Sequence, residues 1–298
     1  MSAYRFCRTD DIGLLVDALN RCWLPYVAGG GPMTPAVFKR SIRDLQVWCS
    51  SSMVAFSGSD PIGVLIGAKR RSATLVHTIA VHPEHRRQGH GRHLLASLGS
   101  KLAILGPPRI VAEVPESLGA ACGLFDACGY SEEAVLTDYT FEESAMTERG
   151  NAARVEAFVI PVTVGDLAAN GLLGAAHPQV CWQRSIETLT ARTDDVAGLA
   201  VASDERIEAY VLYVTRGSAS AGATADTMEE TEIVSLRSFI DDGGARLQQL
   251  LARLRARGME TFRFPKVHPD EISKEWLATL GFSPAGAHRL YAATARSD

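Results

Sequence analysis

One stretch, Leu75 to Leu98, constrains the fold of this chain more than any other; it reads LVHTIAVHPEHRRQGHGRHLLASL. Its start, Leu75 to Val81, is mainly apolar and is typical of a strand, which His82-Pro83 interrupts. A segment rich in arginine and glycine follows, and leucines then recur at helical spacing up to Leu98. The stretch therefore predicts a strand, a basic glycine-containing loop and a helix, in that order.

A loop of this kind at the start of a helix is suited to bind an anion. The first turn of a helix has free backbone N–H groups and the positive end of the helix dipole. Gly89 and Gly91 have no side chains that would hold an anion away from the backbone, and Arg86 and Arg87 add charge-assisted hydrogen bonds. The pattern favours a phosphate site; the alternative is a surface loop whose arginines are merely solvated.

This stretch resembles the acyl-CoA-binding motif of the GNAT superfamily of N-acetyltransferases. The family pattern is Arg/Gln-x-x-Gly-x-Gly/Ala after a strand that ends near Val-x-Pro, and here Arg86, Gly89 and Gly91 follow Val81-His82-Pro83. The resemblance covers residues 4–142 and implies an α/β (α+β) fold with a mixed, mainly antiparallel central sheet flanked by helices. It implies acetyl-CoA as co-substrate, held by the strand end and the loop through Ile79, Val81, Arg86, Arg87, Gln88, Gly89, His90, Gly91 and Arg92.

A second part of the family pattern is a strand leading into a helix, and here Ala121, Phe125 and Gly129-Tyr130 take its positions. Phe125, which the resemblance also places beside the cofactor, stands where the family often has a tyrosine that protonates the departing CoA thiolate. Phenylalanine has no hydroxyl group, and Leu118 stands where an asparagine is common. The usual general acid is therefore missing from this sequence.

The general base is expected on the strand before the loop. The run from His77 to His82 resembles that of aralkylamine N-acetyltransferases, in which a histidine at this place removes the amine proton through water. Histidine titrates near pH 7, which suits this role, but a strand histidine satisfied by a neighbour remains an equal alternative. Glu113 is a second candidate base. The resemblance also implies that a backbone N–H, assigned here to Val81, polarises the thioester carbonyl.

With 298 residues the chain is long enough for two domains. We expect a GNAT domain over 1–142, closed by a hairpin of Val135-Leu136 and Tyr139 to Phe141, then a polar linker over 143–153. Residues 154–298 repeat the same order of elements, and Gly281-Phe282 matches Gly129-Tyr130. The sequence thus predicts two tandem GNAT-like domains.

The second copy lacks the features of the loop. An alignment without gaps places Asp242 at Arg86 and Ala245 at Gly89, and a leucine at the second glycine. A shift of two residues brings Gly243-Gly244 closer to the glycine positions, but no arginine then precedes them. Because an aspartate repels a pyrophosphate, we expect no CoA binding by this loop.

Three further segments leave alternatives open. Gly29 to Gly31 is either a mobile loop of the acceptor site or a plain connector, and Gly217 to Glu230 is an insertion or a lid. Trp182 beside Arg184 suggests either an exposed tryptophan that lines a pocket or packing between the domains.

Charge and composition exclude several classes of protein. A net charge of −4 gives no case for nucleic acid or an anionic membrane as partner, and no apolar run reaches membrane-spanning length. The 6 cysteines form no CxxC pair, which is typical of reduced thiols in a cytoplasmic protein. A metal site is not expected among the crowded histidines, because arginines share their loop. Five histidines lie there: His77, His82, His85, His90 and His93.

Two functions compete at this point. The first is an N-acetyltransferase that moves an acetyl group from acetyl-CoA to a primary amine by direct attack, using the N-terminal domain. Its acceptor would be a small-molecule amine or an amino group of a larger substrate, and the chain a monomer or homodimer. The alternative, motivated by Phe125, is a non-catalytic acyl-CoA-binding, sensing or scaffold protein with a GNAT fold.

Overall fold

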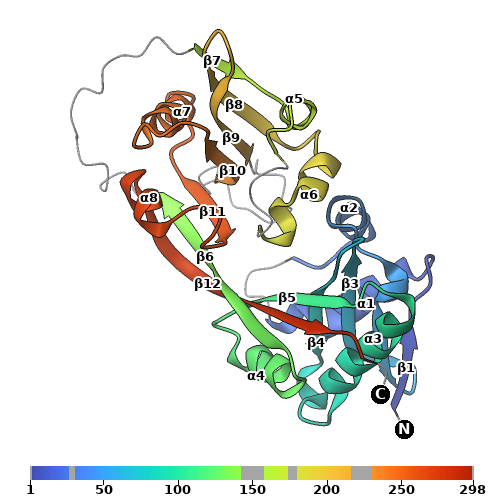
Figure 1. Ribbon diagram of the computed structural model, residues 1–298. Coiled ribbons are helices and arrows are strands. Elements are labelled where there is room, and N and C mark those ends of the chain that lie inside the picture. The colour runs from blue at the N-terminus through green and yellow to red at the C-terminus, as the bar shows by residue number, and fades with distance from the viewer. Residues whose placement is uncertain (1, 27–30, 142–157, 174–179, 216–229, 297–298) are drawn as a thin grey trace. The chain divides into compact units, whose positions relative to one another are not determined.

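The structure is a computed structural model that describes residues 2–26, 31–141, 158–173, 180–215 and 230–296 (Figure 1). The chain forms two compact units: Met1–Val135 together with Arg289–Asp298, and Leu136–His288. Its strands follow the hydrogen-bonded order β1-β2-β3-β4-β5-β12-β6-β11-β10-β9-β8-β7. The predicted mixed α/β fold is confirmed.

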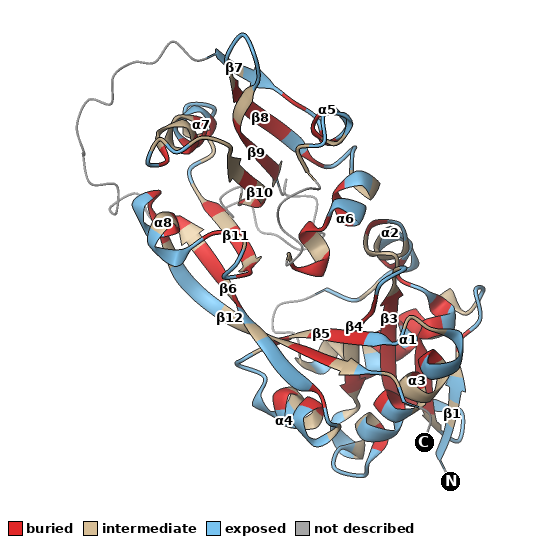
Figure 2. Ribbon diagram, in the orientation of Figure 1, coloured by how far each residue is buried: buried red, intermediate tan, exposed pale blue. Residues whose placement is uncertain are grey.

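The first unit has its strands in one sheet with helices packed on it. α3 (His90–Leu105) shows how the sequence sets this packing, because its leucines from Leu94 to Leu102 recur along one face and are buried, whereas the opposite face is exposed (Figure 2). The elements are β1 (Ser2–Phe6), α1 (Ile12–Cys22), η1 (Leu24–Tyr26), α2 (Pro35–Leu45), η2 (Cys49–Ser51), β2 (Met53–Ser57), β3 (Asp60–Lys69), β4 (Thr74–Val81), η3 (Pro83–His85), α3 (His90–Leu105), β5 (Arg109–Pro115), α4 (Gly119–Ala127) and β6 (Ser131–Phe141).

The second unit repeats this order of elements. Its elements are β7 (Phe158–Pro161), α5 (Val164–Ala169), η5 (Trp182–Arg184), α6 (Ile186–Ala191), β8 (Ala197–Ala202), β9 (Ile207–Thr215), β10 (Thr231–Ser238), α7 (Ala245–Arg255), β11 (Phe262–Val267), α8 (Lys274–Thr279) and β12 (Phe282–Thr294). In both units an antiparallel run of strands ends in one parallel pair, β4 with β5 and β10 with β11. The internal repeat is therefore visible in the sheet itself.

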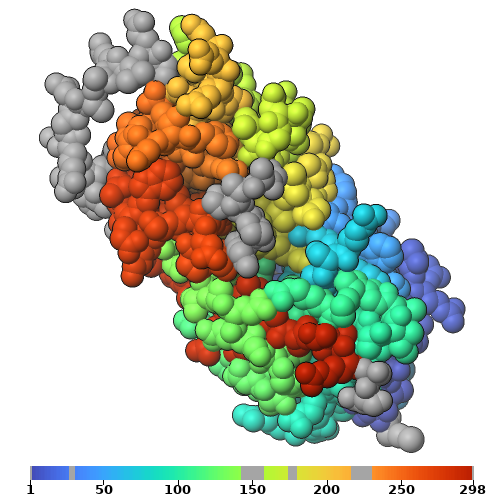
Figure 3. Space-filling model, in the orientation of Figure 1, coloured from blue at the N-terminus to red at the C-terminus, as the bar shows by residue number. Residues whose placement is uncertain are grey.

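The predicted hairpin at the end of the first domain is wrong, because Ser131–Phe141 is one continuous strand. β6 begins in the first unit and ends in the second, where Thr140 pairs with Arg263 of β11. β12 begins in the second unit and ends in the first. Its last part lies between β5 and β6, which is the place that the second strand of the predicted hairpin would have taken. The red atoms of the chain's C-terminal end accordingly lie among green atoms of the first unit (Figure 3). The two units thus exchange strands.

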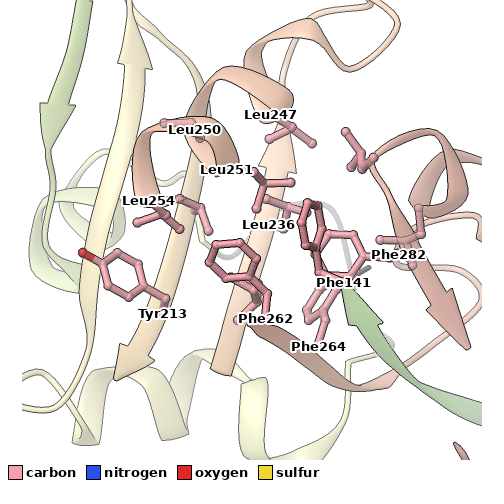
Figure 4. Close-up of a cluster of buried hydrophobic side chains, with 14 of the residues drawn as sticks. Phe141, Tyr213, Leu236, Leu247, Leu250, Leu251, Leu254, Phe262, Phe264 and Phe282 are labelled. Atoms are coloured by element: carbon pink, nitrogen blue, oxygen red, sulfur yellow. The ribbon is translucent and has the colours of Figure 1, made fainter. Parts of the chain in front are cut away.

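The core of the second unit depends on this exchange. Leucines of α7 cover a group of aromatic rings from the sheet (Figure 4). Phe141, at the end of β6, meets Phe262 at 5.3 Å and Phe282 at 5.6 Å between ring centroids, both edge-on. Edge-to-face aromatic contacts of this kind stabilise a core beyond the area that they bury.

Several predicted segments fall outside the described residues. These are the linker over 143–153, most of the insertion over 217–230 and the glycines at positions 29 and 30. Within the described ranges, the helices are all too short or too polar to cross a membrane.

Candidate functional site

The site is built where β4 and β5 part. These parallel strands pair at Thr74 with Ile110 and at Leu75 with Val111, and no later pair joins them in the described part of the chain. His77 and Glu113, the two candidate bases, each lie two residues beyond the last pair and are half-buried. The structure therefore brings both candidates to the opening of a gap within the sheet.

A β-bulge coincides with His77. On the other side of β4, Ile66 pairs with Thr78 and Gly67 pairs with Val76, so that His77 is the extra residue on its strand. Bulges increase local twist and redirect side chains, and they are common beside active sites. The bulge therefore takes His77 out of the regular register with β3 and changes the direction of its side chain from that of a regular strand residue.

The backbone of Val81 is turned toward the same gap. The N–H of His82 donates to the Ile62 carbonyl across to β3, at 2.9 Å. In an antiparallel pair the hydrogen-bonding groups of successive residues point to opposite sides. The N–H and C=O of Val81, and those of Ile79 two residues before it, consequently face away from β3 and toward the gap.

The loop presents an uncapped helix N-terminus. Gly89 is the N-cap of α3 with φ +85°, which a residue with a side chain rarely adopts, and among the described residues no side chain accepts a hydrogen bond from the first N–H groups of this helix. The hydrogen bond from the His93 N–H to the Gly89 carbonyl is the first of α3, so the N–H groups before it are left for an anion. Arg86, Arg87 and Arg92 are all exposed around them, as is Gln88.

Gly91 has a packing role that the sequence did not reveal. A Cβ placed there would meet Leu124 Cδ2 at 3.0 Å, which is closer than real Cβ contacts normally come. Gly91 thus allows α3 to approach α4 closely. The lack of a side chain at this position serves helix packing as well as access to the loop.

Tyr26 is a site residue that sequence reasoning missed. Its hydroxyl donates to the Val81 carbonyl at 2.5 Å and accepts a hydrogen bond from Arg86 Nε. The Arg86 guanidinium also lies 4.1 Å from the centre of the Tyr26 ring. Tyr26 therefore links the loop to the end of β4; its place just before the glycines at 29–31 was the only sequence signal.

His90, in contrast, faces inward. Its side chain is buried, and its Nδ1 lies 2.6 Å from the Tyr4 hydroxyl. Burial lowers the pKa of His90, and the nearby His85 and His93 lower it further. Among the described residues no group of three or more His, Cys, Asp or Glu side chains could hold a metal ion.

Phe125 lies in the core of the first unit and not at its surface. It is 1% exposed and contacts Tyr130 edge-on, with 5.1 Å between ring centroids. Tyr130 is buried as well, and burial raises the pKa of its hydroxyl far above its usual value. Phe125 therefore joins the hydrophobic core, and the structure does not bring it to the exposed loop.

In the second unit two parallel strands also part, but neither candidate base has a titratable residue in its place. β10 and β11 pair at Thr231 with Phe262 and at Glu232 with Arg263, and a register shift makes Val234 the bulged residue. Counting from the first pair in each unit, Val234 takes the place of His77 and Pro265 that of Glu113. Neither candidate base has a titratable counterpart in the second unit.

The corresponding helix of the second unit is capped by its own chain. Gly244, with φ +88°, is the N-cap of α7, so it corresponds to Gly89. The alignment without gaps placed Ala245 at Gly89 and is therefore wrong by one residue. The Asp242 carboxylate accepts hydrogen bonds from the N–H groups of Gly244 and Arg246, each at 3.0 Å. A carboxylate thus occupies the place that an anion would take at α3.

The family model described as the acetyltransferase (GNAT) family matches residues 17–130. This range contains β4, the loop and α3, together with β5 and α4. This part of the chain is a GNAT domain.

Solved GNAT structures of similar fold extend the match to the whole chain. A tandem GNAT protein from the clavulanic acid biosynthesis pathway is 16% identical, with a TM-score of 0.65 and 100% coverage of both chains. A GCN5-related N-acetyltransferase from Sphaerobacter thermophilus is 13% identical, with a TM-score of 0.62 and coverage of 99% of this chain and 96% of that one. A probable N-acyltransferase from Enterococcus faecalis is 13% identical, with a TM-score of 0.66, and the match covers 100% of this chain and 73% of that one.

At these identities the solved structures establish the fold and not the activity. They confirm the tandem GNAT arrangement that the repeated elements predicted. The family model lies within the N-terminal half of the chain, where the uncapped loop also lies.

Proposed function

We propose that this protein is an N-acetyltransferase that uses its first unit to transfer an acetyl group from acetyl-CoA to a primary amine. The observation that carries the proposal is the uncapped N-terminus of α3, with three exposed arginines around it, beside the diverging β4 and β5. Free N–H groups and arginines suit the pyrophosphate of CoA, and the gap suits its extended thioester arm.

The chain's own residues would supply the general base and the hydrogen bond to the carbonyl oxygen. The amine nitrogen attacks the thioester carbonyl carbon, so that a C–N bond forms and the C–S bond breaks. His77 or Glu113 takes the proton that the amine loses, and the Val81 N–H stabilises the negative charge on the carbonyl oxygen. With Phe125 in place of an acid, the CoA thiolate leaves as such and takes its proton from water; a thiol of ordinary pKa permits this near neutral pH.

Direct attack is favoured over an acyl-cysteine intermediate. Cys22, which lies under the site, is fully buried, and burial raises the pKa of its thiol to about 11. A thiol in that state is a poor nucleophile at neutral pH. The acetyl group would therefore pass straight from the thioester to the amine.

Calorimetric titration with acetyl-CoA tests the cofactor site. We expect one site per chain in the wild type and a loss of affinity of at least about a hundredfold in Arg86→Glu, because this change removes charge-assisted bonds and adds repulsion. Arg71→Glu is the matched control, because Arg71 is an exposed arginine at the opposite end of β4. Two sites per chain would contradict the role given to Asp242, and no binding would overturn the proposal.

The base assignment needs a separate experiment. If His77 is the base, His77→Ala should lower kcat with little change in acetyl-CoA affinity, whereas Glu113→Gln should have the smaller effect. Full turnover by His77→Ala would remove this assignment and leave Glu113 as the candidate. The acceptor for these assays is sought among small amines and amino groups of larger molecules.

A second candidate function is acyl-CoA binding without catalysis. The burial of Phe125 motivates it, since the position of the usual acid lies inside the core. Both functions require Arg86, but only an enzyme releases free CoA in the presence of an amine. Stoichiometric acetyl-CoA binding without CoA release across a broad amine panel would favour the second function.

A further inference from the structure

The second unit contains a cavity of about 230 Å³. Its wall includes Ser235 and Arg237 of β10, Tyr210 of β9 and Leu189 of α6. By the strand correspondence above, Ser235 takes the place of Thr78, one residue past the bulge. The cavity therefore lies at the part of the second sheet that corresponds to the proposed transfer site of the first.

A buried ion pair closes one side of this cavity. Arg184 is 4% exposed and binds Glu271 in a bidentate manner, with 2.6 Å between Nη1 and Oε1. It also donates to the Lys266 carbonyl at 3.0 Å and lies 4.6 Å from the centre of the Phe264 ring. The alternative of an exposed tryptophan that lines a pocket is wrong, because Trp182 is buried; Arg184 and Ser185 line this cavity instead.

The cavity wall carries two arginines and two glutamates: Arg184 and Glu271 are paired, Glu187 is exposed, and Arg237 is the positive group left for a ligand. The charges of Arg184 and Glu271 offset each other, although Arg184 Nε is buried without a hydrogen-bond partner among the described residues. Arg237 donates from Nη1 to the Leu172 carbonyl at 3.2 Å, hydrogen-bonds to the Tyr210 side chain and lies 4.8 Å from the centre of the Phe239 ring; a guanidinium has five N–H donors, so some remain for a ligand. The planar fork of an arginine fits a carboxylate in particular.

Hydroxyl groups next to Arg237 complete the polar wall. Ser235 Oγ donates to the Tyr210 hydroxyl at 3.2 Å, and the Tyr210 side chain is otherwise buried. Hydroxyls can turn to donate to an anion, because their hydrogens rotate. One arginine with two hydroxyls, above an apolar wall that includes Leu189, forms a concave site with few polar groups, as small-molecule sites usually are.

We infer that this cavity binds a small carboxylate-bearing molecule, held by Arg237 with Ser235 and Tyr210. The second unit has its helix N-terminus capped by Asp242 and has no counterpart of either candidate base. Its ligand is therefore bound and not acetylated there. The inference does not depend on catalysis by the first unit.

Titration of the full-length protein with succinate and L-glutamate tests the inference, with succinamide and L-glutamine as uncharged counterparts. We expect one saturable site per chain for at least one of the two acids, and binding at least about tenfold weaker for its amide. Arg237→Gln should weaken acid binding at least about tenfold, and Arg237→Lys should lose less. Circular dichroism checks that each variant is folded.

Two controls locate the site. Arg253→Gln removes an exposed arginine from α7 and should leave the affinity unchanged. Arg86→Glu should also leave it unchanged; loss of acid binding in that variant would assign the anion to the loop of the first unit and overturn the inference. Absence of saturable binding by both acids, equal binding of their amides, or unchanged affinity in Arg237→Gln would overturn it as well.

Discussion

The rings of Phe125 and Tyr291 are stacked, with 5.5 Å between their centroids and 15° between their planes. Phe125 belongs to α4 of the first unit, and Tyr291 belongs to the last strand of the chain. The hydrophobic core of the first unit therefore includes a side chain from the far end of the sequence. The first unit is complete only when the C-terminal strand is in place.

Replacing Tyr291 should destabilise the first unit strongly. Tyr291 is fully buried, and Tyr291→Ala would leave a cavity against Phe125, so we expect a loss of about 3–5 kcal/mol in the free energy of unfolding. Urea denaturation measures this loss. Phe158→Ala, at a position 67% exposed, is the matched control and should change stability by less than about 0.5 kcal/mol. Equal effects of the two changes would contradict the role of the exchanged strand.

Two glycines should respond in opposite directions to alanine. At Gly67 a Cβ would lie 2.4 Å from the Ser51 carbonyl oxygen, so Gly67→Ala must displace backbone and should destabilise by several kcal/mol. At Gly99, inside α3, a Cβ meets nothing within 4 Å, so Gly99→Ala should stabilise by about 0.5–1 kcal/mol. Thermal unfolding of both variants measures the two shifts, and a stabilised Gly67→Ala would show that this close approach is absent.

Stability should fall on mild acidification because of His90. Its pKa is lowered from 6.5 mainly by burial, so between that value and its lower pKa in the folded state the unfolded chain binds more protons. The free energy of unfolding therefore rises with pH within this window and gains nothing more from His90 above it. His90→Asn, which keeps an acceptor for the Tyr4 hydroxyl, should flatten this part of the profile. Parallel profiles for the variant and the wild type would rule out His90 as the cause.

The native protein should react slowly with thiol reagents. Five of its 6 cysteines are buried, and Cys128 is partly exposed. Burial raises the pKa of Cys7 to about 12 and also raises the pKa of Cys128. We expect at most one thiol per chain to react with Ellman's reagent at pH 8 before unfolding, and all 6 in denaturant. Fast reaction of a native thiol would reopen the acyl-cysteine route.

Local sequence patterns were enough to predict the elements on which the proposal rests. The apolar run to Val81, the glycine at 89 and the leucines of α3 predicted strand, loop and helix, because strand pattern, left-handed backbone and helical spacing are properties of neighbouring residues. The repeat of these elements in the second half predicted the tandem arrangement for the same reason.

The contacts between residues far apart in the chain could not be predicted in this way, because they depend on how the chain folds as a whole. Nothing in the local pattern of residues 131–141 distinguishes a hairpin from the long strand that pairs with β11, because the choice depends on partners far along the chain. The contacts of Tyr26 with Arg86, and of Arg184 with Glu271, likewise join segments that the sequence holds apart. The sequence predicted only that Asp242 would repel a pyrophosphate. In the structure the backbone places the Asp242 carboxylate at the N-terminus of α7, where it accepts hydrogen bonds from the N–H groups.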